Sequence, residues 1–352
     1  SSEGIAMANY ARVRLSDAVT RGLYYSGAFA ASRRLLRKTS AVILRYHSVC
    51  EHARSPLSYI DPGLSVPLEA FDRQMKLLRE RYAPVSLEDV VEAVGGGRPL
   101  PNRAVAVTFD DGYRDNHQYA FPVLRKYGIA GAFYITAGCV NMGEPLWTSR
   151  LRYYFTATRQ PSLALSQPEP KQLDLTSPAA RNASFAYTIA TIKSVGKVRG
   201  GELFRDVEAK LAVTDLAPLN DCMMTWGEIE EMSKGGQTLG AHTLTHPNLP
   251  GLPPEEADAE IAGSKSLIEE KIKAPVLHFA YPNGRGVSHF NEPVREMVKK
   301  AGFLSSVTSI NGPVYRDDDP FTLQRLGVYR KHASLSRFAL DIERTRLAGP
   351  KA

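Results

Sequence analysis

The chain has 352 residues, of which 43% are hydrophobic and 23% are charged, the composition of a globular protein with a sizeable core. Its formal net charge is only +7, and no basic cluster is interleaved with aromatic side chains, which argues against nucleic-acid binding. The three cysteines show no C-x-x-C spacing, which argues against a disulfide framework and a thiolate zinc site.

The N-terminal segment has a character of its own. We interpret residues 1–6 as the remnant of an expression tag and residues 7–39 as a basic, amphipathic helical extension, with Leu15, Val19 and Leu23 on one face. Its apolar stretch, residues 22–31, is too short to span a bilayer. We expect residues 7–38 to pack on the rest of the protein or to contact an anionic membrane peripherally, and we expect a cytoplasmic protein, with secretion as the alternative.

A catalytic domain is predicted over residues 40–347, where short apolar runs alternate with helical patterns. The predicted strands cover residues 41–46, 104–109, 131–136, 237–241, 276–281 and 304–308. The predicted helices cover residues 68–81, 87–94, 116–127, 226–234, 254–272 and 292–301. The strands carry little polar alternation, which is typical of parallel strands covered on both faces. The alternation predicts an α/β fold with a parallel sheet, either open or closed into a barrel.

One stretch interrupts this alternation. Residues 141–220 are mostly polar and helical in pattern, and four prolines in the middle indicate a loop. We interpret the stretch as an insertion on the sheet and not as a separate domain.

Two adjacent carboxylates, Asp110 and Asp111, end the apolar strand 104–109. Buried carboxylates are costly unless a positive group binds beside them, and the carboxyl ends of parallel strands are where α/β proteins place their active sites. Gly112 allows the sharp turn that follows. A plain turn before a helix cap is the structural alternative for this motif taken alone.

Two histidines, His242 and His246, follow another predicted strand, and their four-residue spacing lets one turn of chain bring both to a single metal ion. H-x-x-x-H is weak evidence by itself. Together with a carboxylate-rich strand end, it indicates a His-His-Asp metal site.

At this point the motifs resemble those of a known family. T-F-D-D-G-Y at residues 108–113 and G-A-H-T-L-T-H-P-N-L at residues 240–249 are similar to the signature of the polysaccharide deacetylases, the NodB-homology or carbohydrate esterase family 4 proteins. The segments 43–48 and 224–226 resemble motifs of the branch that acts on bacterial exopolysaccharides, and the segment 279–284 resembles the third motif of the family. The resemblance covers roughly residues 41–330, less the insertion, and implies a distorted (β/α) barrel of about seven strands.

The resemblance also implies roles for individual residues. Asp111, His242 and His246 would hold a divalent metal, most often Zn²⁺, with Co²⁺ or Ni²⁺ as alternatives, and Asp110 would be the general base. Three protein ligands leave room for water and for the carbonyl of an N-acetyl group. The substrate would be an N-acetylated saccharide. Its predicted contacts are Tyr113, Tyr281, Pro282 and Asn283.

The sequence departs from the family pattern in three places. Ala280 stands where the family usually has the arginine that holds the catalytic aspartate, so another cation must hold Asp110, or none does. Asn283 replaces the usual aromatic residue, and no C-terminal Leu-x-His motif is recognisable. That motif often supplies the general acid. We therefore predict His47 as the acid, supported by a carboxylate or backbone carbonyl, with His332 as the second candidate.

Three functions remain open from the sequence. The first is metal-dependent removal of N-acetyl groups from an N-acetylhexosamine of a polysaccharide or its precursor. The second keeps the fold and metal but acts on a non-sugar amide or imide. The third is a non-catalytic, carbohydrate-binding relative, which has no physical reason to retain the charged pair of Asp110 and Asp111.

Overall fold

The computed structural model describes residues 40–51, 59–286 and 288–348. The predicted N-terminal extension, residues 7–39, and the tag remnant lie outside the described residues. Within these residues no helix is long and apolar enough to cross a membrane.

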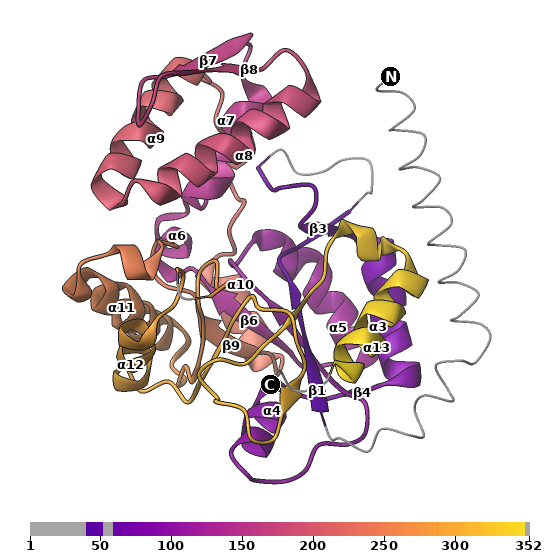
Figure 1. Cartoon of the computed structure of the whole chain (residues 1–352). Coiled ribbons are helices and arrows are strands. Elements are labelled where there is room, and N and C mark those ends of the chain that lie inside the picture. Colours follow the sequence, from indigo (N-terminus) through magenta and orange to yellow (C-terminus); the bar gives the residue numbers. More distant parts are fainter. Residues whose placement is uncertain (1–39, 52–58, 287, 349–352) are drawn as a thin grey trace.

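A curved, mostly parallel sheet forms the centre of the protein (Figure 1). Its strand order is β11-β10-β9-β6-β5-β1-β12, with β13 also paired to β1 and β4 to β5. Only β12 runs antiparallel to its neighbour in this sheet. The strands are β1 (Ser40–Tyr46), β4 (Ala83–Pro84), β5 (Ala104–Phe109), β6 (Gly131–Ile135), β9 (Thr238–Ala241), β10 (His278–Ala280), β11 (Ser305–Val307), β12 (Val314–Tyr315) and β13 (Leu326–Gly327). A small separate pair, β2 (Ser48–Cys50) and β3 (Ser65–Pro67), follows β1.

The two ends of the sheet are joined by the chain between β12 and α13. Leu323 forms a parallel bridge with Val307 of β11, and Leu326 pairs with Leu44 of β1. This segment therefore lies between the first and last strands of the sheet and curls it into a distorted barrel. The prediction of a (β/α)7-type barrel of the NodB class is confirmed.

Helices cover the outside of the barrel. They are α3 (Leu68–Arg81), α4 (Leu87–Val94), α5 (Phe121–Tyr127), which continues a π-helical turn (Asn116–Ala120), α6 (Ala137–Met142), α10 (Trp226–Lys234), α11 (Pro254–Ile272), α12 (Glu292–Lys300) and α13 (Leu335–Leu347). Several start signals are plain in the sequence: Ser86 and Thr225 each form a capping box at the helix that follows. The predicted bounds of α3, α4, α10 and α11 are confirmed, whereas α13 was not predicted.

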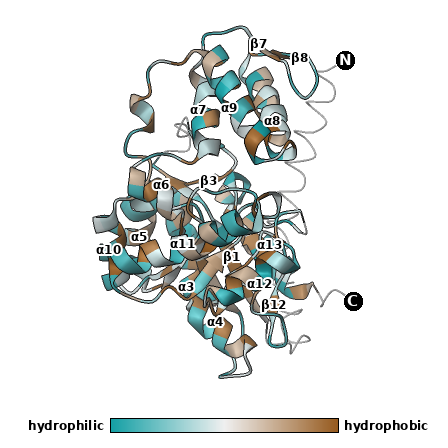
Figure 2. Cartoon of the chain, turned by 90° about the vertical axis from the view of Figure 1, so that its left-hand side faces the viewer, coloured by the Kyte–Doolittle hydropathy of each residue, from teal (hydrophilic) through white to brown (hydrophobic). Residues whose placement is uncertain are grey.

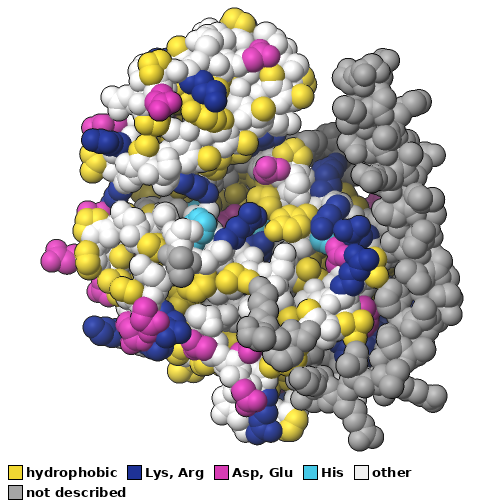
Figure 3. Space-filling view, viewed as in Figure 1, with side chains coloured by type: hydrophobic (Ala, Val, Ile, Leu, Met, Phe, Trp, Pro, Cys, Tyr) yellow, Lys and Arg dark blue, Asp and Glu magenta, His cyan; other side chains and the backbone are white. Residues whose placement is uncertain are grey.

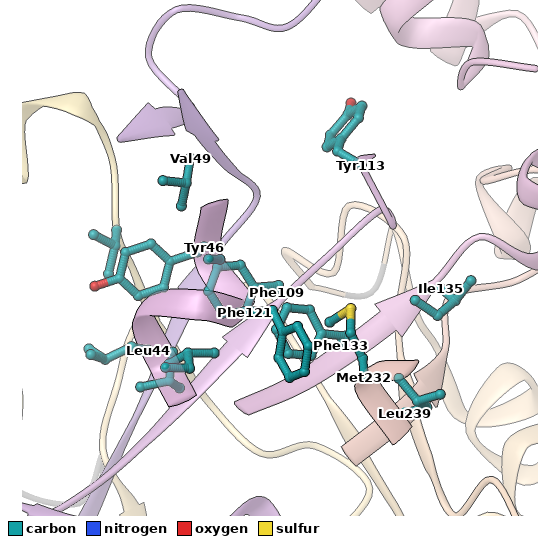
Figure 4. Close-up of a cluster of buried hydrophobic side chains, with 14 of the residues drawn as sticks. Leu44, Tyr46, Val49, Phe109, Tyr113, Phe121, Phe133, Ile135, Met232 and Leu239 are labelled. Atoms are coloured by element: carbon teal, nitrogen blue, oxygen red, sulfur yellow. The ribbon is translucent and has the colours of Figure 1, made fainter. Parts of the chain in front are cut away.

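The sides of the strands differ in what they bury. Alternate residues that face the helices are large and aromatic: the Phe109 ring stacks on Phe133 at a centroid distance of 4.6 Å and on Tyr46 at 5.3 Å (Figure 4). The opposite residues, which face the barrel interior, include Ala104, Ala106 and Ala132, which belong to a different buried cluster. Small interior side chains leave room for polar groups at the barrel's carboxyl end.

The insertion forms its own bundle above the barrel (Figures 1 and 2). It contains α7 (Trp147–Ala157), α8 (Pro178–Ser194), α9 (Lys197–Leu211) and a hairpin of β7 (Ser162–Leu165) and β8 (Lys171–Asp174). Fourteen buried residues between Leu151 and Leu219 form a hydrophobic cluster separate from those of the barrel. The loop predicted in its middle is present but short: residues 166–170 connect residues 162–165 to residues 171–174, and these two strands pair antiparallel and bury Leu163, Leu165 and Leu173.

Candidate metal centre and its cavity

The carboxyl end of β5 delivers both aspartates to the same space. Ala104, Ala106 and Thr108 face the barrel interior, and Asp110 continues that alternation beyond the strand. Asp111 would by alternation face the other way, but its φ of +82° and that of +87° at Gly112 turn the chain sharply. A non-glycine residue in this left-handed conformation stores strain of the kind found at functional sites. Both carboxylates line one cavity.

Asp111, His242 and His246 come together as the sequence predicts, and among the described residues they are the one group of His, Cys, Asp or Glu side chains arranged to hold a metal ion. The Asp111 Oδ1 atom lies 3.4 Å from His242 Nε2 and 3.6 Å from His246 Nε2. Ligand bonds of about 2.0–2.2 Å at tetrahedral angles separate ligand atoms by about 3.4 Å. The spacing and chemistry of the three side chains therefore fit a zinc-like ion.

The surrounding groups orient these three side chains and keep them in the protonation states that a metal ion requires. His242 Nδ1 donates to the Ala280 carbonyl at 2.7 Å, which directs Nε2 toward Asp111. Burial lowers the pKa of His246 to about 3, so its ring is neutral at neutral pH, as a metal ligand must be. Burial opposes ionisation of Asp111, but the hydrogen bond from His242 and the histidine charges outweigh it, and its pKa falls well below the usual range.

The loop that carries the two histidines is fixed by residues that the sequence did not single out. Glu260 of α11 accepts from the Leu244 and Thr245 backbone N–H groups at 2.8 and 2.9 Å. Trp147 Nε1 of α7 donates to the His246 carbonyl at 3.2 Å. The barrel and the insertion therefore both hold this loop.

Asp110 is held by Arg325, which lies in the segment that joins the ends of the sheet. Nη1 and Nη2 each donate to one Asp110 oxygen at 2.7 Å, and Nε donates to the Thr308 carbonyl at 2.7 Å. The guanidinium is fully buried. Burial opposes ionisation of Asp110, but the charge of Arg325 outweighs it and lowers the pKa to about 2. Arg325 is the cation that the sequence pattern lacked at Ala280.

His47 lines the cavity with Asp110 and Asp111, as predicted. It follows β1 on the interior side, and Asn116 Nδ2 donates to its carbonyl at 2.8 Å. The predicted carboxylate or carbonyl support for its ring is wrong: Nδ1 is buried with no hydrogen-bond partner among the described residues. Burial lowers the pKa of His47 to about 4, the nearby aspartates oppose this, and Arg45 adds to it. The ring is therefore neutral at neutral pH.

His332, the second candidate acid, lies elsewhere. It is almost fully buried, its Nε2 bonds to Asp341 at 3.0 Å, and its Nδ1 accepts from the Tyr329 backbone N–H at 2.8 Å. Because both ring nitrogens are engaged and the residue does not line the cavity, His332 has no access to a substrate there.

The four predicted substrate contacts divide into two pairs. Tyr113 and Asn283 line the cavity. Tyr281 and Pro282 do not, and the expectation that they contact substrate is wrong. Tyr281 is fully buried, stacks on Phe290, and bonds through its hydroxyl to the Phe321 carbonyl at 3.1 Å. Pro282 is buried beside it.

The cavity above the aspartates has a volume of about 730 Å³. Its floor is the barrel rim, and helix α8 of the insertion supplies part of its wall through Phe185, Ile189 and Lys193. Figure 3 shows histidine and basic side chains in the crease between the insertion and the barrel. This space is large enough for a sugar chain of a few residues.

Comparison with known proteins agrees with this geometry. The polysaccharide deacetylase family model matches residues 97–177 and 178–305. The Bacillus subtilis protein YxkH, named a polysaccharide deacetylase, is 24% identical over 287 residues, which are 81% of this chain and 70% of that protein. The poly-β-1,6-N-acetyl-D-glucosamine N-deacetylase of Escherichia coli K12 is 45% identical over 65 residues, which are 18% of this chain but 10% of that enzyme.

Among solved structures, the Streptococcus pyogenes deacetylase PplD in complex with acetate has the same fold, with a TM-score of 0.55 and 19% identity over 83% of this chain and 93% of that one. The family model spans more than half of the chain, and its match includes the strands and loops that carry the three candidate metal ligands, Asp111, His242 and His246. The chain therefore belongs to the polysaccharide deacetylase family.

Proposed function

We propose that this protein hydrolyses N-acetyl groups on amino sugars of a polysaccharide or its precursor. We further propose that Asp111, His242 and His246 hold the divalent ion that the reaction needs, with Zn²⁺ as the preferred candidate. The observation that carries the proposal is the pairing of this ligand set with an adjacent buried carboxylate, Asp110, fixed by two hydrogen bonds from Arg325. Support also comes from the E. coli relative, whose name states N-deacetylation of poly-N-acetylglucosamine.

The division of labour follows from the positions of the side chains. Asp111, His242 and His246 would hold the ion, which would make water more acidic and the acetyl carbonyl more electrophilic. Asp110, ionised at neutral pH and directed into the cavity, accepts a proton from the attacking water. Arg325 keeps that carboxylate oriented through its two bonds and so acts as a positioning residue.

The departing amine must receive a proton. We propose that His47 gives it, since the histidine opens onto the same cavity. Because burial keeps the free residue neutral above a pKa of about 4, His47 must take up a proton from solvent water as negative charge develops on the substrate beside it, and it then passes this proton to the amine. Tyr113 and Asn283 are the proposed saccharide contacts.

The test is acetate release from N-acetylglucosamine oligomers by metal-loaded protein. We expect release that stops after chelation and returns with Zn²⁺ or Co²⁺. Release from a non-sugar amide alone would support the second function. Saccharide binding without acetate release by protein of verified metal content would show a non-catalytic relative and contradict the proposal.

A further inference from the structure

Three cations from separate parts of the chain line the cavity. Arg45 comes from β1, Lys193 from α8 of the insertion, and Arg285 from the loop after β10. We call these three residues the cationic wall. Since they are distant in sequence, no single helix face or charge run explains their convergence on one space.

Arg45 is the innermost member and is 5% exposed. Its Nη1 bonds to the Ser309 hydroxyl, and its Nη2 donates to the Tyr329 hydroxyl at 2.8 Å. Its Nε is buried with no partner in the described part of the chain. A buried guanidinium with only neutral partners and an unused donor is unfavourable unless an anion arrives.

The other two members are also without a carboxylate. Lys193 Nζ donates to the neutral Asn283 Oδ1 at 2.6 Å. Arg285 is exposed at the cavity mouth, and no carboxylate of residues 40–51, 59–286 or 288–348 lies within ion-pair distance of Lys193 or Arg285. The wall therefore presents positive charge whose direct hydrogen-bond partners among the described residues are neutral.

The carboxylates that line the same cavity have other direct partners. Asp110 pairs with Arg325, and Asp111 belongs to the metal ligand set. Asp61 accepts from the Gly63 backbone N–H at 2.7 Å, and its charge acts on Arg152 on another side of the cavity. Neither Asp110 nor Asp111 forms an ion pair with the wall, although the charge of Asp110 acts through space on Arg45 and that of Asp111 on Lys193.

The three cations lie close enough to repel one another. Burial lowers the pKa of Arg45, the charges of Arg325 and Arg285 lower it further, and the charge of Asp110 opposes this. Burial also lowers the pKa of Lys193, Asp111 opposes this, and Arg285 lowers it again. A bound anion would relieve this repulsion in a partly desolvated space, where charge-assisted hydrogen bonds are strong.

We propose that the saccharide accepted by this cavity is anionic, with a carboxylate or phosphate group on or next to the N-acetylated sugar, and that Arg45, Lys193 and Arg285 bind that group. This rests on the proposed function in placing the N-acetyl group at Asp110 and Asp111. The arrangement puts recognition of the anion and hydrolysis of the amide in one cavity.

The test compares three probes on metal-loaded protein by isothermal titration calorimetry and by acetate release. The probes are neutral tetra-N-acetylchitotetraose (called chitotetraose below), a hyaluronan tetrasaccharide that carries carboxylates, and UDP-N-acetylglucosamine, which carries phosphates. We expect at least one anionic probe to bind about tenfold more tightly than chitotetraose, with an advantage that shrinks as salt is raised. Which one binds distinguishes a carboxylate source from a phosphate source.

The variant Arg285→Gln should weaken that anionic probe about five- to tenfold and leave chitotetraose nearly unchanged. Arg98→Gln is the matched control. Arg98 is an exposed arginine that pairs with Asp89 and does not line the cavity, and its loss changes the net charge by the same amount. Equal binding of all three probes, or equal effects of the two variants, would overturn the anionic proposal.

The two proposals fail in different ways. Acetate release from chitotetraose with no preference for anions, and no effect of Arg285→Gln, leaves the deacetylase function and removes the anionic substrate. Tight, Arg285-dependent binding of an anionic probe, with no acetate from any probe, keeps the anion site and removes the deacetylase function.

Discussion

The barrel rim and the cationic wall line one cavity but are built in contrasting ways. At the rim, Asp110 receives two hydrogen bonds from Arg325, and His242 is fixed by the Ala280 carbonyl. On the wall, Lys193 has one neutral acceptor, and Arg285 is exposed. The rim holds its groups in one geometry before any ligand binds, as catalysis requires. The wall leaves charge available, as recognition requires.

The largest effect in this comparison is expected from Arg325→Gln. Loss of the guanidinium leaves a buried carboxylate unpaired, which costs about 3–5 kcal/mol of folding free energy and raises the pKa of Asp110. We expect kcat to fall roughly 10³-fold and the acid limb of the pH–rate profile to move to higher pH. Arg325→Lys, which keeps the charge, should recover part of that shift.

The same pair sets an acid limit to stability. In the folded protein the pKa of Asp110 is about 2, below its ordinary value of 3.8, so ionised Asp110 stabilises the fold above about pH 4. That contribution is lost as the pH falls from about 4 to 2. Urea unfolding at pH 3 and pH 6 should show a smaller difference in Arg325→Gln than in the wild type. An unchanged difference would contradict the pairing.

His47→Ala should have the next largest effect. We expect folding and metal content to be retained and kcat to fall roughly 10²-fold, the usual contribution of a positioned proton donor. In the metal-free protein, NMR titration should place the pKa of His47 near 4, because burial disfavours its charged form. Full activity of the variant would remove His47 from the mechanism.

A smaller effect is expected behind the rim. Glu260→Gln keeps the shape of the side chain but weakens the two backbone hydrogen bonds that fix the His242–His246 loop. We expect Zn²⁺ affinity to fall about tenfold, as is usual for groups that orient metal ligands. Glu269→Gln, on the same helix but bonded to Lys265 and Val276, is the control and should leave the Zn²⁺ affinity unchanged.

Much of the rim could be predicted from the sequence because its residues follow apolar strands directly. The burial of β5 and the turn at Gly112 are both encoded by residues next to the aspartates, so the positions of Asp110 and Asp111 can be predicted from a short stretch of sequence. The histidines of the H-x-x-x-H motif are local in the same way.

Arg325 could not be predicted because its partner, Asp110, lies 215 residues away in the sequence. The segment around Arg325 is also short, and Leu323, Leu326 and Val328 are its only sign of a strand. The signal that could have identified it is an arginine placed within a run of apolar residues. Lys193 and Arg285 gave no local signal, since only the position of the insertion over the barrel brings them together. The predicted substrate contact at Tyr281 is wrong because its position in the motif does not reveal that its ring packs in the core.

The most direct test of the division of labour at the rim measures bound zinc and acetate release together in Asp110→Asn and Asp111→Asn. We predict about one zinc per chain in Asp110→Asn, with kcat roughly 10²–10⁴-fold lower, because the base is lost and the ligands are intact. Asp111→Asn should lose the zinc itself. Equal loss of zinc from both variants, or normal acetate release by either, would contradict the account.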